Sequence, residues 1–273
     1  MFSVCLRSTV LILGMAVGFA SHAGARELRV CADPNNLPFS NKDGTGFENK
    51  IAAIVASELH ATIVYTWWAQ RRGFLREALL SGRCDLVPGT VAGNDMLRTT
   101  RPYYRSSYVF LTRRSDDIQI TSLDDPLLRT KTIGVQLVGD DGSNTPPAHA
   151  LARRGLAQNL RGYPVYGNYA GSSPGRTIVA ALDAGAIDVA IVWGPTAGYF
   201  ALHDDVRLDL RPVTPNVDLP MLPMVFDITM GVRRDDVNLR DEVNNALSKH
   251  RMAIDAILTA YGVPRADSAG GPP

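Results

Sequence analysis

The sequence predicts an α/β fold of two similar lobes that enclose a cleft. Patterns of buried strands and amphipathic helices alternate along the chain from Glu27, which is typical of parallel sheets with right-handed crossovers. A helix end, a glycine turn, an Asp and a buried strand occur in LLSGRCDLVPGT and again, about a hundred residues later, in ALDAGAIDVAIVWG. This repetition indicates two related lobes.

The individual elements follow from hydrophobic periodicity and from the turn residues between them. In the predicted helix 47–59, for example, Phe47, Ile51 and Val55 recur at helical spacing. The other predicted helices are 73–82, 147–154, 176–185 and 236–262. The predicted strands are 27–33, 61–68, 84–90, 106–114, 131–139, 161–167, 186–194 and 226–234.

Two of these strands, 106–114 and 226–234, are expected to cross between the lobes, and the last helix then returns to the first lobe. The cleft is expected to be lined by loops at the carboxyl ends of the strands, where open α/β sheets bind ligands. Such a cleft also permits hinge closure. The expected division is a signal peptide at 1–23, the first part of lobe one at 26–114, lobe two at 115–222, a crossing strand and return to lobe one at 223–265, and a disordered tail at 266–273.

The N-terminus has the features of an export signal. Arg7 precedes the apolar run 10–20, and residues 21–23 place small side chains at a cleavage site, with Ala25 as a second cleavage point. The run is shorter than the roughly 20 residues of a membrane-spanning helix, so a permanent anchor is the less favoured interpretation. We therefore expect a periplasmic protein with no membrane insertion after the signal is cleaved.

Composition and charge restrict the class of partner. The chain has 273 residues, of which 45% are hydrophobic and 20% charged, with a formal net charge of +1. This length is enough for one large domain or two lobes. A nucleic-acid partner normally requires a basic face, so the near-neutral balance argues against one.

Two cysteines remain after the signal, Cys31 and Cys84. An even pair in an oxidising compartment is often a disulfide. Both residues fall in predicted strands, so contact between them is feasible, but sequence alone does not establish the required geometry. A disulfide and two buried free thiols remain alternatives.

Several long blocks resemble the MxaJ/XoxJ family, also written MoxJ: CADPNNLPFSN, GFENKIA, YTWWAQRRGF, GRCDLVPG, TTRPYYRSSYVF, SLDDP, IGVQLVGDDGSNTPPAHALARRG and DVAIVWGPTAGYF. The resemblance extends from Leu28 to about Gly262. It implies a two-lobed periplasmic binding protein of the type II solute-binding fold, with a role as an accessory protein of PQQ-dependent methanol dehydrogenase. The blocks YTWWAQRRGF and GDDGSNTPPAH favour the lanthanide-type enzyme over the calcium-type enzyme as partner.

Amino-acid receptors of the wider superfamily provide a contrast. They hold the ligand carboxylate with the bidentate fork of an Arg in the first lobe, and the ligand ammonium with an Asp in the second. The comparable positions here are the stretch 93–96, which lacks Arg, and Trp193. Because a zwitterion would bury its charges unpaired, an ordinary amino-acid receptor is disfavoured.

Six segments are expected to contact a ligand or partner; structural packing is the alternative for most of them, and a calcium loop is the alternative for the acidic strand-to-helix loop. The candidate residues are Asp33, Asn36 and Phe39 after the first strand, Trp68, Gln70 and Arg71 after the second, Thr90 at the end of the third, Tyr103 and Arg105 before the first crossing strand, Asp140, Asp141, Asn144 and Thr145 in a strand-to-helix loop, and Trp193 and Tyr199 after the last strand of lobe two. Trp and Arg are enriched at interface hot spots. The acidic loop lacks the ligand spacing of an EF-hand.

The sequence contains no recognisable catalytic motif. The histidines after the signal, His60, His149, His203 and His250, have no metal-ligand spacing such as HExxH, and neither a GxSxG elbow nor a Walker loop occurs. We therefore expect no enzyme, no metal and no cofactor. The expected function is binding of the dehydrogenase, with a segment of its polypeptide in the cleft, to assist activation or maturation. The alternative is a receptor that delivers a small polar ligand to an ABC importer.

Overall fold

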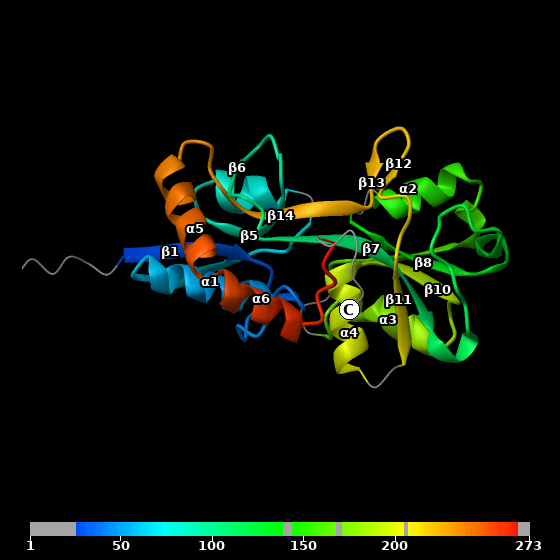
Figure 1. Ribbon diagram of the computed structural model, residues 1–273. Coiled ribbons are helices and arrows are strands. Elements are labelled where there is room, and N and C mark those ends of the chain that lie inside the picture. The colour runs from blue at the N-terminus through cyan, green and yellow to red at the C-terminus, as the bar shows by residue number, and fades with distance from the viewer. Residues whose placement is uncertain (1–25, 72, 139–143, 168–170, 205–206, 267–273) are drawn as a thin grey trace, which may run out of the picture.

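The computed structural model describes residues 26–71, 73–138, 144–167, 171–204 and 207–266. It shows an elongated molecule of two lobes joined by two long strands, β7 (Tyr104–Arg113) and β14 (Val225–Val232) (Figure 1). Lobe one, at the left of Figure 1, contains β1 and α1 together with the last two helices, α5 and α6. The chain therefore begins and ends its described fold with elements of the same lobe.

Lobe one is built on a parallel pair of strands covered by helices. β1 pairs with β4, with Leu28 opposite Ile63, and a single bridge from Val30 to Leu86 extends this sheet toward β5. The apolar stripe of α1 fills the space between the sheet and the C-terminal helices. The elements of this lobe are β1 (Arg26–Ala32), β2 (Asn35–Asn36), β3 (Ser40–Asn41), α1 (Phe47–Glu58), β4 (Ala61–Trp67), the π-helical segment η1 (Leu75–Leu80), β5 (Val87–Val91), β6 (Arg98–Thr99), α5 (Val237–Lys249) and α6 (Arg251–Ala260).

Lobe two has a sheet with helices on both faces. β8 pairs in parallel with β9 and β10, and β10 and β11 pair antiparallel with β7. Side chains of α2 join one apolar cluster of this lobe, and those of α3 and α4 join another. The elements are η2 (Arg114–Asp116), η3 (Pro126–Thr130), β8 (Ile133–Leu137), α2 (Pro146–Arg153), η4 (Ala157–Asn159), β9 (Leu160–Pro164), α3 (Gly175–Asp183), β10 (Val189–Trp193), α4 (Gly194–His203), β11 (Leu208–Pro212), β12 (Val217–Asp218) and β13 (Leu222–Pro223).

β7 exchanges its pairing partner halfway along its length. Tyr104 to Ser107 pair antiparallel with β14, whereas the second half of β7 pairs with two strands of lobe two, β10 along Tyr108 to Thr112 and β11 along Val109 to Arg113. The exchange takes place between adjacent residues, Ser107 and Tyr108. One strand therefore belongs to both lobes, and the boundary between the lobes lies at this point of β7.

The predicted helix 236–262 is two helices in the structure. His250 separates α5 from α6, with backbone angles of φ −101° and ψ 21° that leave the α-helical region. Lys249 and His250 both place their side-chain nitrogens on the Glu58 carboxylate, at 2.7 and 2.8 Å. Because the bend lets both helices bury apolar residues in the core of lobe one, tertiary packing overrides the continuous helical pattern.

The last turn of the fold brings α6 directly onto lobe two. A side chain at Gly198 of α4 would place its Cβ only 1.8 Å from the carbonyl oxygen of Gly262, so this contact requires glycine. Beyond it, the Ser106 hydroxyl donates to the Pro264 carbonyl at 2.6 Å. The segment after α6 therefore packs against both α4 and β7.

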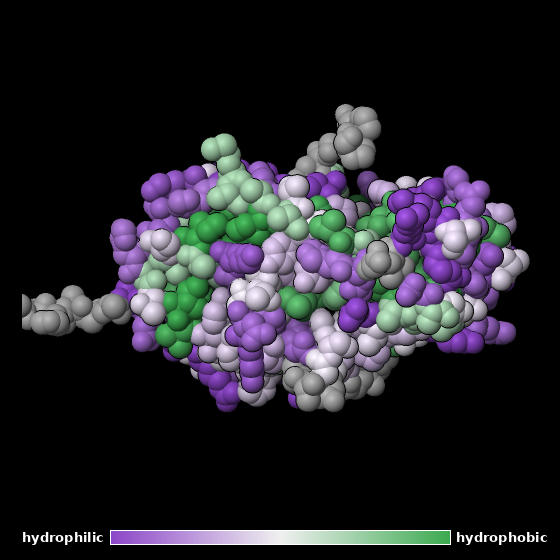
Figure 2. Space-filling model, turned by 90° about the horizontal axis from the view of Figure 1, so that it is seen from below, coloured by the Kyte–Doolittle hydropathy of each residue, from purple (hydrophilic) through white to green (hydrophobic). Residues whose placement is uncertain are grey.

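The space-filling view shows how hydrophilic and hydrophobic residues are distributed over one face of the molecule (Figure 2). Hydrophilic side chains cover much of both lobes on the face in Figure 2, with apolar patches between them on lobe one. Within the described residues, no helix combines the length and the apolar character needed to cross a membrane.

Cys31 and Cys84 are joined by a disulfide, with their Cα atoms 5.4 Å apart. Cys31 lies near the end of β1, and Cys84 lies just before Leu86, which bridges to the same strand. Both are buried in a small apolar cluster with Phe74 and Leu79. The disulfide therefore links β1 to the segment that leads directly into β5.

Replacing both cysteines, Cys31→Ser with Cys84→Ser, is expected to lower the free energy of unfolding by about 2–4 kcal/mol, because the crosslink restricts the unfolded chain across a separation of 53 residues. Urea unfolding followed by circular dichroism measures the difference. Reductant should bring the wild-type protein to the stability of the double variant and leave the variant unchanged. Equal stability of the two proteins without reductant would contradict the prediction.

Candidate functional site

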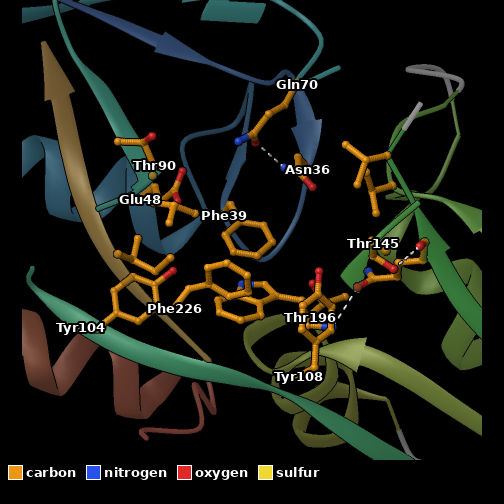
Figure 3. A pocket seen from close by; sticks show the side chains of 18 residues that line it. Asn36, Phe39, Glu48, Gln70, Thr90, Tyr104, Tyr108, Thr145, Thr196 and Phe226 are labelled. Carbon is orange, nitrogen blue, oxygen red and sulfur yellow. Dashed lines mark hydrogen bonds between the residues drawn. The ribbon is translucent and has the colours of Figure 1, made fainter. Parts of the chain in front are cut away.

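A cavity of about 340 Å³ lies between the lobes, at the partner exchange of β7 (Figure 3). Lobe one, lobe two and both crossing strands contribute to its walls. The lining residues are Asn36, Phe39, Glu48, Gln70, Gly89, Thr90, Val91, Tyr104, Tyr108, Gln136, Val138, Thr145, Val165, Gly175, Trp193, Thr196, Phe226 and Ile228. This volume is at the lower end of the range for small-molecule sites.

The wall formed by lobe one depends on the loop after β1. Asp33 is 3% exposed, and its carboxylate accepts hydrogen bonds from the backbone N–H groups of Asn35 and Gln70, at 2.8 and 2.6 Å. The Asn36 amide then donates to the Gln70 side-chain oxygen at 2.9 Å. The Asp33 carboxylate therefore fixes the backbone at Asn35 and Gln70, and the side-chain amides of Asn36 and Gln70 line the cavity.

Three aromatic rings form the part of the wall that the two lobes share. Trp193 ends β10 and stands opposite Tyr108 in the strand register, with their ring centroids 5.4 Å apart. Phe226 of β14 completes the cluster, 5.7 Å from the Trp193 ring. Trp193 and Phe226 pack against the apolar cores of both lobes. The rings thus join the cores and present apolar faces to the cavity.

Gln136 fixes the lobe-two end of this wall. It is 5% exposed, and its side-chain oxygen accepts a hydrogen bond from the Trp193 backbone N–H at 2.8 Å. Its own carbonyl oxygen accepts one from the Thr145 hydroxyl, also at 2.8 Å. Gln136 therefore connects β8, β10 and the start of α2 at the cavity.

Among the described residues that line the cavity, Glu48 is the one acidic residue. It lies in the first turn of α1 and is 7% exposed, and none of the hydrogen bonds or ion pairs among the described residues reaches its carboxyl group. Burial raises the pKa of Glu48 to about 8. At neutral pH the empty cavity therefore contains a mostly neutral carboxylic acid.

The carboxyl group of Glu48 occupies space that another residue leaves free. A Cβ atom at Gly89 of β5 would lie 2.0 Å from its Oε1 atom. Figure 3 shows the Glu48 side chain beside Thr90, directed into the cavity. Glycine at position 89 is therefore a condition for this orientation of Glu48.

Two hydrogen bonds join the lobes across the cleft. The Asn35 amide donates to the Gly171 carbonyl oxygen at 3.1 Å, and the Ser173 hydroxyl donates to the Leu37 carbonyl oxygen at 3.1 Å. Both connect the loop after β1 with the segment before α3. The lobes are therefore in contact at this rim of the cavity.

Six of the residues that the sequence proposed line the cavity: Asn36, Phe39, Gln70, Thr90, Thr145 and Trp193. Others lie elsewhere. Tyr103 is 2% exposed and donates its hydroxyl to the Pro88 carbonyl in the core of lobe one, and its neighbour Tyr104 faces the cavity instead. Arg105 pairs with Asp227 at 3.2 Å outside the lining.

The remaining proposed residues form local contacts. Trp68 packs on the cluster around the disulfide, with the Arg83 guanidinium over its ring, and Arg71 is exposed. Tyr199 stacks on Tyr261, the residue directly after α6, with centroids 5.6 Å apart. Asn144 is exposed in a bridge to Leu137 at the start of the strand-to-helix loop. Asp140 and Asp141 lie outside the described residues.

Glu48, Tyr104, Tyr108, Gln136 and Phe226 line the cavity and were missed by the sequence analysis. The sequence does contain a signal for Glu48: it precedes Ile51, Ala52 and Val55 by three, four and seven residues, which places it in the buried stripe of the helix. A charged residue in such a stripe is a candidate functional group. Within the described part of the chain, no group of three or more His, Cys, Asp or Glu is arranged to hold a metal ion.

Two lobes, two crossing strands and a cavity at their junction define a solute-binding protein. A family model described as bacterial extracellular solute-binding proteins, family 3, matches residues 28–262. The chain belongs to this family and, within it, to the group of MoxJ proteins. The protein MoxJ of Methylorubrum extorquens AM1 is 34% identical over 258 residues, which cover 90% of this chain and 83% of that protein. The resemblance to the MxaJ/XoxJ family and the predicted fold class are thereby confirmed.

Solved structures agree with this placement. The periplasmic binding protein XoxJ from Methylobacterium extorquens AM1 has a TM-score of 0.70 and 35% identity, with 88% of this chain and 100% of that chain covered. MxaJ from Methlophaga aminisulfidivorans MPT has a TM-score of 0.75 at 24% identity, with 87% and 99% covered, and it shares the fold.

Replacing Glu48→Gln is expected to stabilise the protein in a pH-dependent way. Between pH 4.5 and 8 the folded protein retains a proton that the unfolded chain releases, so the free energy of unfolding falls as pH rises through this window. Glu48→Gln does not undergo this loss. Its free energy of unfolding should therefore exceed that of wild type by about 3–5 kcal/mol at pH 8 and by little at pH 5. Urea unfolding at several pH values measures both.

The exposed Glu77 of η1 provides the matched control, since Glu77→Gln leaves the cavity unchanged. It should follow the pH profile of wild type. A Glu48→Gln profile parallel to wild type from pH 5 to 8 would contradict the assignment.

Proposed function

We propose that this protein is a periplasmic accessory protein of a PQQ-dependent methanol dehydrogenase system. It binds the dehydrogenase by taking a side chain or short segment of that enzyme into the cleft, and so assists its activation or maturation. Similarity to MoxJ and XoxJ points to this system, because the MxaJ/XoxJ family accompanies such enzymes. The lanthanide-type enzyme is the partner that the blocks YTWWAQRRGF and GDDGSNTPPAH favour.

The observation that carries the proposal is the chemistry of the cavity wall. No Arg or Lys occurs among the described residues that line it, so a free amino acid would find no fork for its carboxylate. Aromatic rings and uncharged amides dominate instead, and these groups are suited to side chains of a polypeptide. The volume of about 340 Å³ accommodates one or two side chains.

Binding without catalysis fits the same wall. Glu48 has no ion-pair partner among the described lining residues, and these include no His, Cys, Ser, Lys or Asp, the groups that most often form catalytic pairs with a carboxylate. The periplasmic location in the proposal follows from the export signal in residues 1–23.

Two substitutions test the cleft as the docking site. Trp193→Ala removes the ring shared by the two lobes, and Val91→Trp fills the mouth of the cavity from a side chain that is 42% exposed. Each is expected to weaken binding of the purified dehydrogenase about tenfold or more, since large aromatic anchors dominate interface energies. Biolayer interferometry with the immobilised protein measures the dissociation constants.

Val237→Trp is the control for bulk, because Val237 is similarly exposed, at 38%, and lies outside the cavity. It should bind the dehydrogenase as wild type does. Thermal unfolding of every variant identifies any loss that arises from misfolding. Wild-type affinity of both folded cleft variants would place the docking site elsewhere.

The size and closure of the cavity favour one second candidate function, a receptor that delivers a small polar ligand to an ABC importer. A cavity of about 340 Å³ with hydrogen bonds across its rim suits a small molecule held between closed lobes. Mass spectrometry of small molecules retained by protein purified from the periplasm separates the two functions. A stoichiometric metabolite with no co-purified dehydrogenase would favour the receptor.

A further inference from the structure

We infer that the cleft recognises a cationic group, an ammonium or guanidinium, which binds against the Glu48 carboxylate between the aromatic rings of the two lobes. The inference rests on the proposed function of the cleft as the binding site, and it specifies the chemistry of the occupant. A lysine or arginine side chain of a partner polypeptide and a free organic amine share this chemistry.

The first argument is the missing partner of Glu48. Glu48 is only 7% exposed, and the carboxyl group of so deeply buried a residue normally has hydrogen bonds or an ion pair. Here the described residues provide neither, and the group is directed into a cavity large enough for a ligand (Figure 3). A cation that enters the cavity would supply the ion-pair partner that Glu48 lacks among the described residues.

The second argument is the sign of the surroundings. No positively charged side chain lines the described cavity, so an anion would meet Glu48 without compensation. Phe39, Tyr108, Trp193 and Phe226 also line the cavity, and the faces of aromatic rings attract cations through their quadrupole. The first turn of α1 also favours negative charge on Glu48 once a cation is present.

Binding is consequently coupled to proton release. Glu48 is mostly protonated at neutral pH in the empty cavity, and the cation pairs with its ionised form. The titratable groups that face it are the hydroxyls of Tyr65, Tyr103 and Tyr104, and their raised pKa values, caused first by burial, keep them neutral throughout this range. Below pH 8 the association constant should therefore fall about tenfold per pH unit.

Isothermal titration calorimetry of the purified protein tests the inference with two probes, n-butylammonium chloride and a short peptide with a central lysine and blocked termini. Both probes stay cationic up to pH 9. At least one should bind, with an association constant that rises about fiftyfold from pH 6 to pH 8 and by only about a further twofold above it. Preference for the peptide indicates a polypeptide source of the cation, and preference for the free amine indicates a solute.

Variants locate the effect. Glu48→Gln should weaken binding at pH 9 at least tenfold and abolish the pH dependence, whereas Glu77→Gln should bind as wild type does. Gly89→Ala should weaken binding as well, because its Cβ displaces the carboxyl group. Binding of neither probe, binding independent of pH, or wild-type affinity of Glu48→Gln would each overturn the inference.

The dehydrogenase assay keeps the two proposals separate. If the enzyme binds through the cleft but Glu48→Gln leaves its affinity unchanged, the docking proposal stands and the cation inference fails. If the amine binds with the expected pH dependence and the dehydrogenase does not bind, the cation inference stands and the docking proposal fails.

Discussion

The exchange of pairing partners within β7 is the constraint on which the cleft depends. Backbone hydrogen bonds continue from β14 through β7 to β10 without interruption, so this side of the molecule is one continuous sheet. The register then places Trp193 directly opposite Tyr108 at the exchange point, and β14 brings Phe226 beside them. The aromatic wall is therefore a direct consequence of strand pairing, and it needs no loop to position it.

Helix packing, and not strand pairing, places Glu48 at the same cavity, and burial of its carboxyl group lowers the stability of the protein. α1 is anchored by its apolar stripe, and the first turn of that stripe ends at the cavity. Gly89 leaves the space that the carboxyl group occupies, 41 positions later in the chain. A buried acid without a partner opposes folding at neutral and alkaline pH. Groups that weaken the empty protein in this way are commonly those that a ligand later satisfies.

The sequence predicted the architecture well because it depends on repeated local patterns. Strand and helix patterns alternate along the sequence, and the two long apolar strands are distinct from the shorter ones. The positions of β7 and β14 could therefore be predicted from the sequence. Trp193 was also placed at the cavity, since the end of a parallel strand in such sheets faces the ligand side. These inferences need only the periodicity of a single segment.

The residues that the sequence misjudged depend on register or on distant partners. Tyr103 and Tyr104 are adjacent, and a shift of one residue in the start of β7 decides which of them faces the cavity. Trp68 turns toward the disulfide cluster because Arg83, 15 residues later, lies over its ring. The buried stripe of α1 does mark Glu48, but the pairing of its carboxyl group with the space at Gly89 is visible only in the structure. Such pairings arise in three dimensions and leave no local pattern.

Residues of both lobes line the cavity, so a ligand bound there would contact both lobes. Glu48 belongs to lobe one, Trp193 and Gln136 belong to lobe two, and the rim is joined by hydrogen bonds of Asn35 and Ser173. A cation held by the carboxylate and the rings touches both lobes at once, so its binding free energy adds to the contacts that keep them together. A ligand shifts a conformational equilibrium only through its differential affinity for the two states. In the inferred complex, contacts with both Glu48 and Trp193 would favour the arrangement of the lobes in which these two residues lie close together.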